Sequence, residues 1–223
     1  FKAQRIVDEA GLLACSMYVD LKPIRAAICE SPNQAKHTSA YDRMQAQKGI
    51  DMPSAALDLV AVTTEEAGKK IRETPVHELR EERRRKRRNP TGRRVLRDGW
   101  LAPLKLEHKK LASDPQVCQQ PFRASDRGFL DLDVDEYLTL LKWTAKQGCK
   151  SAGGQPSKAS QGILMSVGIQ PDRWRDLVWE YKRYFGRSAC AGSPGAMCAD
   201  AKRLGKAYRS GQQLVRECFL TPA

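Results

Sequence analysis

A tyrosine, a helix-breaking proline and two basic residues stand close together near the start of the chain. Tyr18 is followed by Lys22, Pro23 and Arg25. A tyrosine hydroxyl can act as a nucleophile that forms a covalent intermediate, and basic side chains bind phosphate groups. The set could therefore cleave a phosphodiester. A tyrosine on an apolar helix is most often a packing residue whose hydroxyl finds a partner at the surface, so a structural role for Tyr18 stays open.

A helix from about residue 7 to residue 21 is expected to carry this tyrosine. Its apolar side chains recur at a spacing close to i, i+4, i+8, which places them on one face: Leu12, Leu13, Met17 and Leu21. Pro23 interrupts the pattern, and a short second helix over residues 24–29 can resume with Pro23 in its first turn. Tyr18 is thus predicted to lie shortly before a kink or break.

The segment YVDLKPIR, residues 18–25, closely resembles the Y-[IV]-x-x-N-P-[IV]-[RK] segment of the REP-associated tyrosine transposases. These enzymes are a branch of the single-tyrosine HUH transposases. The flanks of that block look similar too, at FKAQ (1–4), DEA (8–10) and KHTS (36–39). The segment RASDRGFL (123–130), with EYL (136–138) and LKWT (141–144), looks like the C-terminal extension of large members of the group.

The resemblance implies that Tyr18 matches the family's nucleophile, which attacks single-stranded DNA and forms a 5′-phosphotyrosine. Such an intermediate conserves the phosphodiester energy for rejoining. A phenol is almost wholly protonated at neutral pH, so the phosphate must be polarised. In the family a divalent ion, Mg or Mn, does this, held by an H-x-H motif N-terminal to the tyrosine. The family also has asparagine at the position of Lys22, where it could cap the resuming helix.

The three histidines of this chain, His37, His77 and His108, are dispersed and form no H-x-H motif. Because the chain also begins at Phe1 rather than at a methionine, we expect it to be the C-terminal portion of such a transposase. That portion by itself is expected to hold no metal and to cleave no DNA, whereas Mg or Mn is expected for the intact parent.

The charge of the chain favours a polyanionic partner. Lysine and arginine outnumber aspartate and glutamate by 39 to 26, which gives a net charge of +13. Nucleic acid is the commonest such partner. A membrane is disfavoured, because no apolar run approaches the roughly 20 residues of a spanning helix and the basic residues face no apolar stripe.

Nine of the fifteen residues from 83 to 97, here called the basic run, are lysine or arginine. Charge runs are often only solvated, but this density favours a nucleic acid nearby, with strong and sequence-blind binding. The expected partner is single-stranded or hairpin DNA, with a monomer and a homodimer both open. The predicted DNA-binding residues are Lys22, Arg25, Arg83, Arg84, Arg85, Lys86, Arg87, Arg88, Arg93, Arg94 and Arg97.

Seven cysteines stand singly, without a C-x-x-C pair, which is typical of reduced thiols in a cytoplasmic protein. Cys190 and Cys198 could approach each other across a Gly/Pro loop. A disulfide or metal site there is disfavoured, because partner ligands are missing.

The predicted fold class is mostly α. Residues 1–35 are expected to be the tyrosine-helix end of an α/β HUH domain, 36–97 a partly helical basic linker, and 98–223 a small C-terminal helical domain. Helices are predicted over about 38–47, over 134–147 with an Asp133/Glu136 capping box, over 171–185, and over 196–208. The apolar stripe of the 171–185 helix, which contains Trp174 and Tyr181, is expected to pack in the core rather than to stack on bases.

Two other functions remain open. One is a non-enzymatic, basic nucleic-acid-binding protein in which Tyr18 is structural, and the other is a decayed element whose product has no retained function.

Overall fold

The computed structural model describes residues 3–52, 96–106, 125–148, 154–205 and 212–220. Within these residues the chain is mostly helical, with two short parallel strands, which confirms the predicted mostly-α class. The elements are β1 (Arg5–Ile6), α1 (Glu9–Asp20), α2 (Lys22–Arg25), the 3₁₀ helix η1 (Pro32–Gln34), α3 (Ser39–Gln47), α7 (Val134–Gln147), α8 (Lys158–Ser166), α9 (Pro171–Trp179), α10 (Tyr181–Phe185), β2 (Cys190–Ala191), α11 (Pro194–Arg203) and α12 (Gln212–Arg216).

The chain divides into two compact units. The first unit joins Phe1–Tyr41 to Leu132–Ala223, and the second is Asp42–Asp131. This division differs from the predicted boundaries at residues 35 and 97, because the N-terminal segment packs on helices from the other end of the chain. Most of the predicted linker, residues 53–95, lies outside the described residues.

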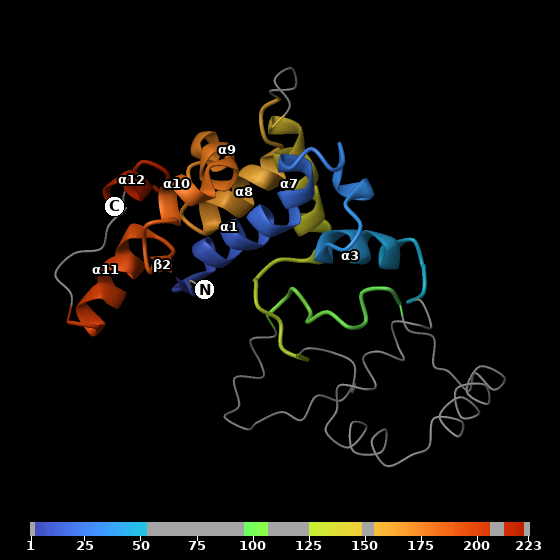
Figure 1. The fold of residues 1–223 in the computed structure, drawn as a ribbon, viewed down its shortest axis with the longest axis horizontal. Coiled ribbons are helices and arrows are strands. Elements are labelled where there is room, and N and C mark those ends of the chain that lie inside the picture. The colour runs from blue at the N-terminus through green and yellow to red at the C-terminus, as the bar shows by residue number, and fades with distance from the viewer. Residues whose placement is uncertain (1–2, 53–95, 107–124, 149–153, 206–211, 221–223) are drawn as a thin grey trace, which may run out of the picture. The chain divides into compact units, whose positions relative to one another are not determined.

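The core of the first unit forms where α1 meets α9 and α10 (Figure 1). Leu13 and Met17 of α1 and Trp174 and Leu177 of α9 are all fully buried. The indole Nε1 of Trp174 donates a hydrogen bond to Thr144 Oγ1 of α7 at 2.8 Å. Burying each large apolar side chain contributes about 1.5–3 kcal/mol in favour of the folded state. The expectation that the stripe containing Trp174 packs in the core is confirmed.

The two strands bring the ends of the first unit together. In parallel register, Arg5 of β1 lies opposite Cys190 of β2, and Ile6 lies opposite Ala191. Helix α1 follows β1 directly and runs against β2 so closely that a Cβ on Gly11 would lie 2.5 Å from the carbonyl oxygen of Ala191. Glycine is therefore required at this position of α1 by the packing of its backbone.

Asp8 joins the starts of two helices. One of its carboxylate oxygens accepts the N–H of Gly11 at 2.8 Å and so caps α1, while the other accepts the N–H of Ser193 at 2.7 Å. Ser193 in turn caps α11, because its hydroxyl accepts the N–H of Ala196 at 3.3 Å. One carboxylate thus fixes where α1 and α11 begin relative to each other.

Several predicted helices are confirmed close to their predicted bounds. Helix α7 begins after Asp133 with the predicted capping box, in which the Asp133 N–H donates to Glu136 at 2.9 Å, and it ends at Gly148. Helices α1 and α3 lie within their predicted ranges. Helix α8, capped by Ser157, was not predicted at all.

The predicted helix over 171–185 is wrong as a single element. It is broken at Glu180, whose φ of −105° and ψ of 27° leave the helical region. The side chains that flank the break have different partners: Trp179 donates to the carbonyl of Thr144 at 3.1 Å, and Tyr181 stacks on Tyr18. We attribute the break to these tertiary contacts.

The second helix after Pro23 is shorter than predicted. It ends at Arg25 because Ala27 adopts a left-handed conformation with φ of 53°, which an alanine rarely takes inside a helix. The helix predicted over 196–208 begins earlier, at Pro194, and its last helical residue is Arg203.

In the second unit, Asp42 of α3 holds two side chains from further along the chain. Its carboxylate accepts Arg97 Nε at 2.6 Å and Trp100 Nε1 at 3.1 Å. The neighbouring Arg43 donates to the carbonyl of Ala102 at 2.8 Å. Separately, none of the helices in the described part of the chain combines the length and the apolar character that a membrane span needs.

Two glycine-to-alanine changes should have opposite effects. Gly11→Ala should lower the free energy of unfolding by about 1–3 kcal/mol, because its Cβ meets the backbone of β2. Gly162→Ala, at an exposed position of α8 with no atom within 4 Å of the new Cβ, should raise it by about 0.5–1 kcal/mol. Urea unfolding followed by circular dichroism measures both, and a harmless Gly11→Ala would contradict the close approach of α1 to β2.

Candidate functional site

The ring of Tyr18 is covered by two side chains. Tyr181 of α10 stacks on it with ring centroids 4.8 Å apart and an interplanar angle of 27°. The guanidinium carbon of Arg25 lies 4.6 Å from the centroid of the Tyr18 ring, in the range of a cation–π interaction. Such contacts contribute about 0.5–1.5 kcal/mol each and hold the phenol in one orientation.

The turn between α1 and α2 places Arg25 over this ring. Backbone hydrogen bonding resumes after Leu21, with the Arg25 N–H donating to the Leu21 carbonyl at 3.0 Å. Arg25 therefore follows Tyr18 by about two helical turns and lies on the same side. Lys22 is exposed and is the first residue of α2, which has no side-chain cap. A lysine at this position is thus compatible with the helix after Pro23.

Tyr181 is buried, and hydrogen bonds through Gln4 fix its position. Its hydroxyl donates to Gln4 Oε1 at 3.3 Å, and Gln4 Nε2 donates to the carbonyls of Phe185 at 2.6 Å and Ser188 at 3.1 Å. Burial, followed by the Cys15 thiol beside the hydroxyl, raises the pKa of the Tyr181 phenol far above its ordinary value. Tyr181 therefore stays protonated and serves as a neutral platform for the Tyr18 ring.

The Tyr18 hydroxyl lacks the kind of hydrogen bond that the Tyr181 hydroxyl makes to Gln4 in the described part of the chain. Among the described residues, no hydrogen bond joins the Tyr18 hydroxyl to another group of the protein, and the residue is half-buried. The protein thus orients the ring by stacking, and within the described residues it uses no hydrogen bond to the oxygen.

Asp20, two residues after Tyr18, anchors the end of α1. Its buried carboxylate accepts the hydroxyl of Ser39 at 2.9 and 3.0 Å and the hydroxyl of Tyr137 at 2.7 Å, and the Ala40 N–H lies 3.4 Å away. These bonds tie the end of the tyrosine helix to α7 and to the start of α3. They also occupy the carboxylate, so Asp20 is not a free ligand beside Tyr18.

The described residues do not fit a Mg or Mn ion. No group of three or more histidine, cysteine, aspartate or glutamate side chains comes together in the part of the chain that the structure describes. His37 is exposed, while His77 and His108 lie outside the described residues. The nearby Asp20 already has hydrogen-bond partners.

The predicted DNA-binding residues lie in different surroundings. Arg25 covers Tyr18, Lys22 is exposed, and Arg97 in the second unit pairs with Asp42 at 2.6 Å. Within the first unit, Arg25 lies against the Tyr18 ring, and Lys22 stands at the start of the same short helix, α2. The other eight lysine and arginine residues of the basic run lie outside the described residues: Arg83, Arg84, Arg85, Lys86, Arg87, Arg88, Arg93 and Arg94.

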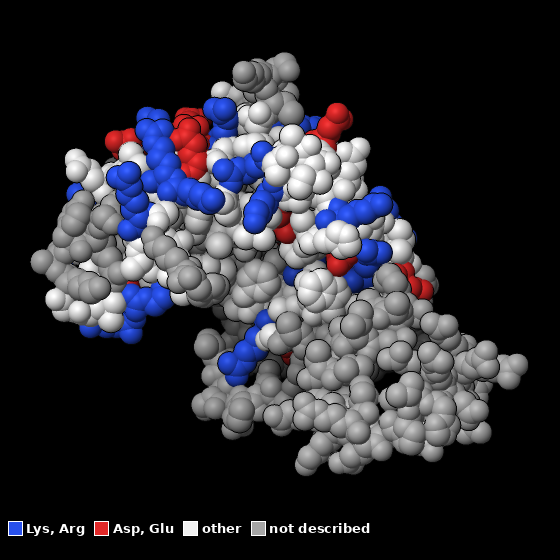
Figure 2. All heavy atoms as spheres, viewed as in Figure 1, with Lys and Arg blue, Asp and Glu red and all other residues white. Residues whose placement is uncertain are grey.

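Basic side chains gather over α9 and α10 on the face drawn in Figure 2, with acidic side chains between them. Two of the resulting ion pairs are Arg175 with Asp176 at 3.5 Å and Arg183 with Glu180 at 2.6 Å. Neither Cys190 in β2 nor Cys198 in α11 forms a disulfide within the described residues.

Sequence reasoning missed the partners of Tyr18. The apolar stripe correctly predicted that Tyr181 is buried, but no spacing relates it to Tyr18 or to Gln4. Comparisons of the chain with protein-family models, curated proteins and solved structures found no match.

Removing one hydroxyl tests the anchor at the end of α1. Tyr137→Phe leaves the buried Asp20 carboxylate without its 2.7 Å partner, so the free energy of unfolding should fall by about 1.5–3 kcal/mol. A double-mutant cycle with Asp20→Ala, read by urea unfolding, should show strong non-additivity, because the second change removes the group left unpaired. Additive effects would contradict the coupling.

The raised pKa of Tyr181 predicts a loss of stability in alkali. Burial and then the Cys218 thiol also raise the pKa of Tyr184 to about 12. Above pH 10 the unfolded chain releases protons from both phenols while the folded chain keeps them, so the free energy of unfolding falls as pH rises.

Tyr181→Phe should make this fall shallower by up to about 1.4 kcal/mol per pH unit, and Tyr181→Phe with Tyr184→Phe shallower still. Urea unfolding at pH 8, 10 and 11 measures the slopes. Equal slopes in the wild type and the double variant would show that neither phenol stays protonated in the folded state.

Proposed function

We propose that this chain is the C-terminal part of a single-tyrosine DNA transposase in which Tyr18 attacks single-stranded or hairpin DNA. The observation that carries the proposal is the Tyr18 phenol itself. Its ring is held by Tyr181 and Arg25, while its oxygen makes no hydrogen bond to the described part of the protein. A nucleophile needs a fixed orientation and an oxygen that is not already hydrogen-bonded to the protein.

The proposed step is a reversible transesterification. The Tyr18 oxygen forms a bond to phosphorus, the bond from phosphorus to the 3′ oxygen breaks, and the proton of the phenol ends on the released 3′-hydroxyl. The products are a 5′-phosphotyrosine and a 3′-hydroxyl end, with no oxidation or hydrolysis. A later attack by a 3′-hydroxyl on the phosphotyrosine reverses these bond changes and rejoins a strand.

Arg25 supports this chemistry as a cation beside the nucleophile. Its guanidinium lies over the ring from which the phenol oxygen projects, and a guanidinium presents several donors that match phosphate oxygens. Negative charge grows on those oxygens during attack, and a fixed cation stabilises it. The exposed Lys22 adds a second positive charge at the same turn. Because the described residues do not fit Mg or Mn, no step is assigned to a metal ion.

A second candidate is a basic nucleic-acid-binding protein without catalysis. The stacking of Tyr18 on Tyr181 is also the geometry of a packing tyrosine, and the net charge of +13 would supply affinity for DNA by itself. This candidate predicts salt-sensitive binding and no covalent adduct.

A covalent-adduct assay separates the two candidates. Protein expressed from the full gene is mixed with an end-labelled, hairpin-flanked single strand in the presence of Mg or Mn, and adducts are resolved on a denaturing gel. The wild type should form an adduct that Tyr18→Phe abolishes. Tyr184→Phe, which removes a hydroxyl elsewhere in the first unit, should leave the adduct in place. An adduct that survives Tyr18→Phe, or none from the wild type, would refute the nucleophile.

The same assay tests the cation. Arg25→Gln should slow adduct formation by about 10²–10³-fold while changing the dissociation constant for the strand much less, because charge on the phosphate grows mainly in the transition state. A loss of binding that equals the loss of rate would instead make Arg25 an ordinary contact to the strand.

A further inference from the structure

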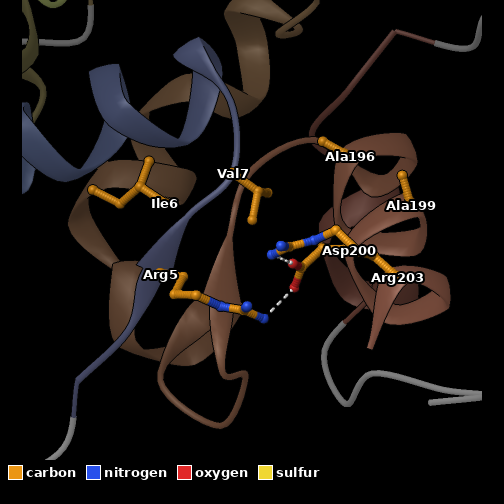
Figure 3. A pocket seen from close by; sticks show the side chains of 7 residues that line it. All are labelled: Arg5, Ile6, Val7, Ala196, Ala199, Asp200 and Arg203. Carbon is orange, nitrogen blue, oxygen red and sulfur yellow. Dashed lines mark hydrogen bonds and ion pairs between the residues drawn. The ribbon is translucent and has the colours of Figure 1, made fainter. Parts of the chain in front are cut away.

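An open hollow of about 550 Å³ lies between β1 and α11, away from the covered face of Tyr18 (Figure 3). Most of α1 separates the two features, about 15 Å at the rise of an α-helix. The hollow is lined by Arg5, Ile6, Val7, Ala196, Ala199, Asp200 and Arg203.

Two arginines converge on one buried carboxylate in this hollow. Arg5 Nη2 donates to Asp200 Oδ2 at 2.6 Å, and Arg203 Nη2 donates to Asp200 Oδ1 at 3.1 Å (Figure 3). The Asp200 side chain is only 5% exposed. Two guanidinium groups and one carboxylate leave one net positive charge, and the acid is the part that is hidden from solvent.

Both guanidinium groups remain open to a ligand. The side chain of Arg5 is 42% exposed and that of Arg203 is 69% exposed. Within the described residues Asp200 is the ion-pair partner of each, and a guanidinium has five N–H donors. Asp200 therefore orients both arginines and leaves donors for an anion.

The two arginines stand on elements that are fixed to each other. The N–H of Arg5 donates to the Ala189 carbonyl at 3.1 Å, and the N–H of Val7 donates to the Ala191 carbonyl at 3.0 Å, which holds β1 to β2. Helix α11 is joined to the start of α1 through Asp8 and the Ser193 N–H. Cations on fixed elements lose little freedom when they bind an anion.

The rest of the lining is apolar, and the hollow is larger than a phosphate alone would fill. Ile6, Val7, Ala196 and Ala199 form it, and a volume of about 550 Å³ lies within the usual range for sites that bind small molecules. The ligand that fits is an anion attached to a body with apolar surface. A phosphate with its adjoining sugar and base has this chemistry.

We propose that this hollow binds a phosphate of single-stranded DNA, with the adjoining sugar and base against the apolar wall. The assignment of the phosphate to single-stranded DNA rests on the proposed function, whereas the anion site itself rests on Arg5, Asp200 and Arg203. The hollow is then a second anchor for the strand, separate from Tyr18 and contributed largely by α11.

Matched arginine variants test this anchor in the present chain. Arg203→Gln is compared with Arg183→Gln, because Arg183 is also exposed, at 63%, and also pairs with an acid three residues earlier. Both changes remove one charge. Fluorescence anisotropy with a labelled single-stranded oligonucleotide should show about a tenfold weaker binding for Arg203→Gln and less than a twofold change for Arg183→Gln. The log–log salt slope should fall by about 0.7 for Arg203→Gln alone.

A third variant keeps the charge and fills part of the hollow with a larger side chain. Ala199→Phe should also weaken binding of the oligonucleotide by several-fold, with circular dichroism unchanged from the wild type. If Arg203→Gln and Arg183→Gln weaken binding equally, the effect is one of net charge and the anchor is refuted. If deoxythymidine 5′-monophosphate displaces the oligonucleotide at an equal concentration of phosphate, the site belongs to a free nucleotide and the strand is refuted as its ligand.

This measurement does not depend on cleavage. If Arg203→Gln selectively weakens binding of the oligonucleotide and protein from the full gene forms no covalent adduct, the anchor is supported and the nucleophile is refuted. An adduct without a selective loss would do the reverse. No binding of single-stranded DNA by the wild-type chain would refute the anchor, whereas the adduct assay with protein from the full gene decides the nucleophile separately.

Discussion

The burial of α1 against α9 and α10 is the constraint on which the first unit depends. Leu13 and Met17 can leave water only if helices from the far end of the chain cover them. That cover also sets the surroundings of Tyr18, because Tyr181 belongs to the same helices. The tyrosine helix and the C-terminal helices are therefore one packed body, and the platform under the candidate nucleophile comes from the other end of the chain.

Three aspartates hold this body together in related ways. Asp8 joins the starts of α1 and α11, Asp20 joins the end of α1 to α7, and Asp200 holds two arginines at the edge of the unit. Each carboxylate receives donors from elements that are far apart in the sequence. Asp20 and Asp200 are buried, whereas Arg25 lies over the ring of Tyr18 and Arg203 is exposed at the surface hollow. A protein that binds a polyanion benefits from this distribution of charge.

Local signals in the sequence predicted a large part of the helical fold. The Asp133/Glu136 capping box and the apolar period predicted α7 almost to the residue, and the stripe containing Trp174 and Tyr181 predicted burial correctly. The break at Glu180 and the end of α2 at Arg25 were not predictable. The break accompanies a hydrogen bond from Trp179 to the distant carbonyl of Thr144. Helix α2 ends because Ala27 adopts a left-handed conformation. Tertiary contacts outweigh helical propensity at such positions, because propensity differences amount to only a few tenths of a kcal/mol.

For the candidate sites, the sequence alone determined that Tyr18 stands on a helix before a proline and that the chain carries an excess of positive charge. Those features are local or compositional, so spacing and counting reveal them. Only the tertiary structure decided that Tyr181 and Arg25 cover the Tyr18 ring, and that Arg5 and Arg203 share Asp200. Such pairs join residues on separate elements, and contacts of this kind leave no period in the sequence because they arise when buried faces pack together.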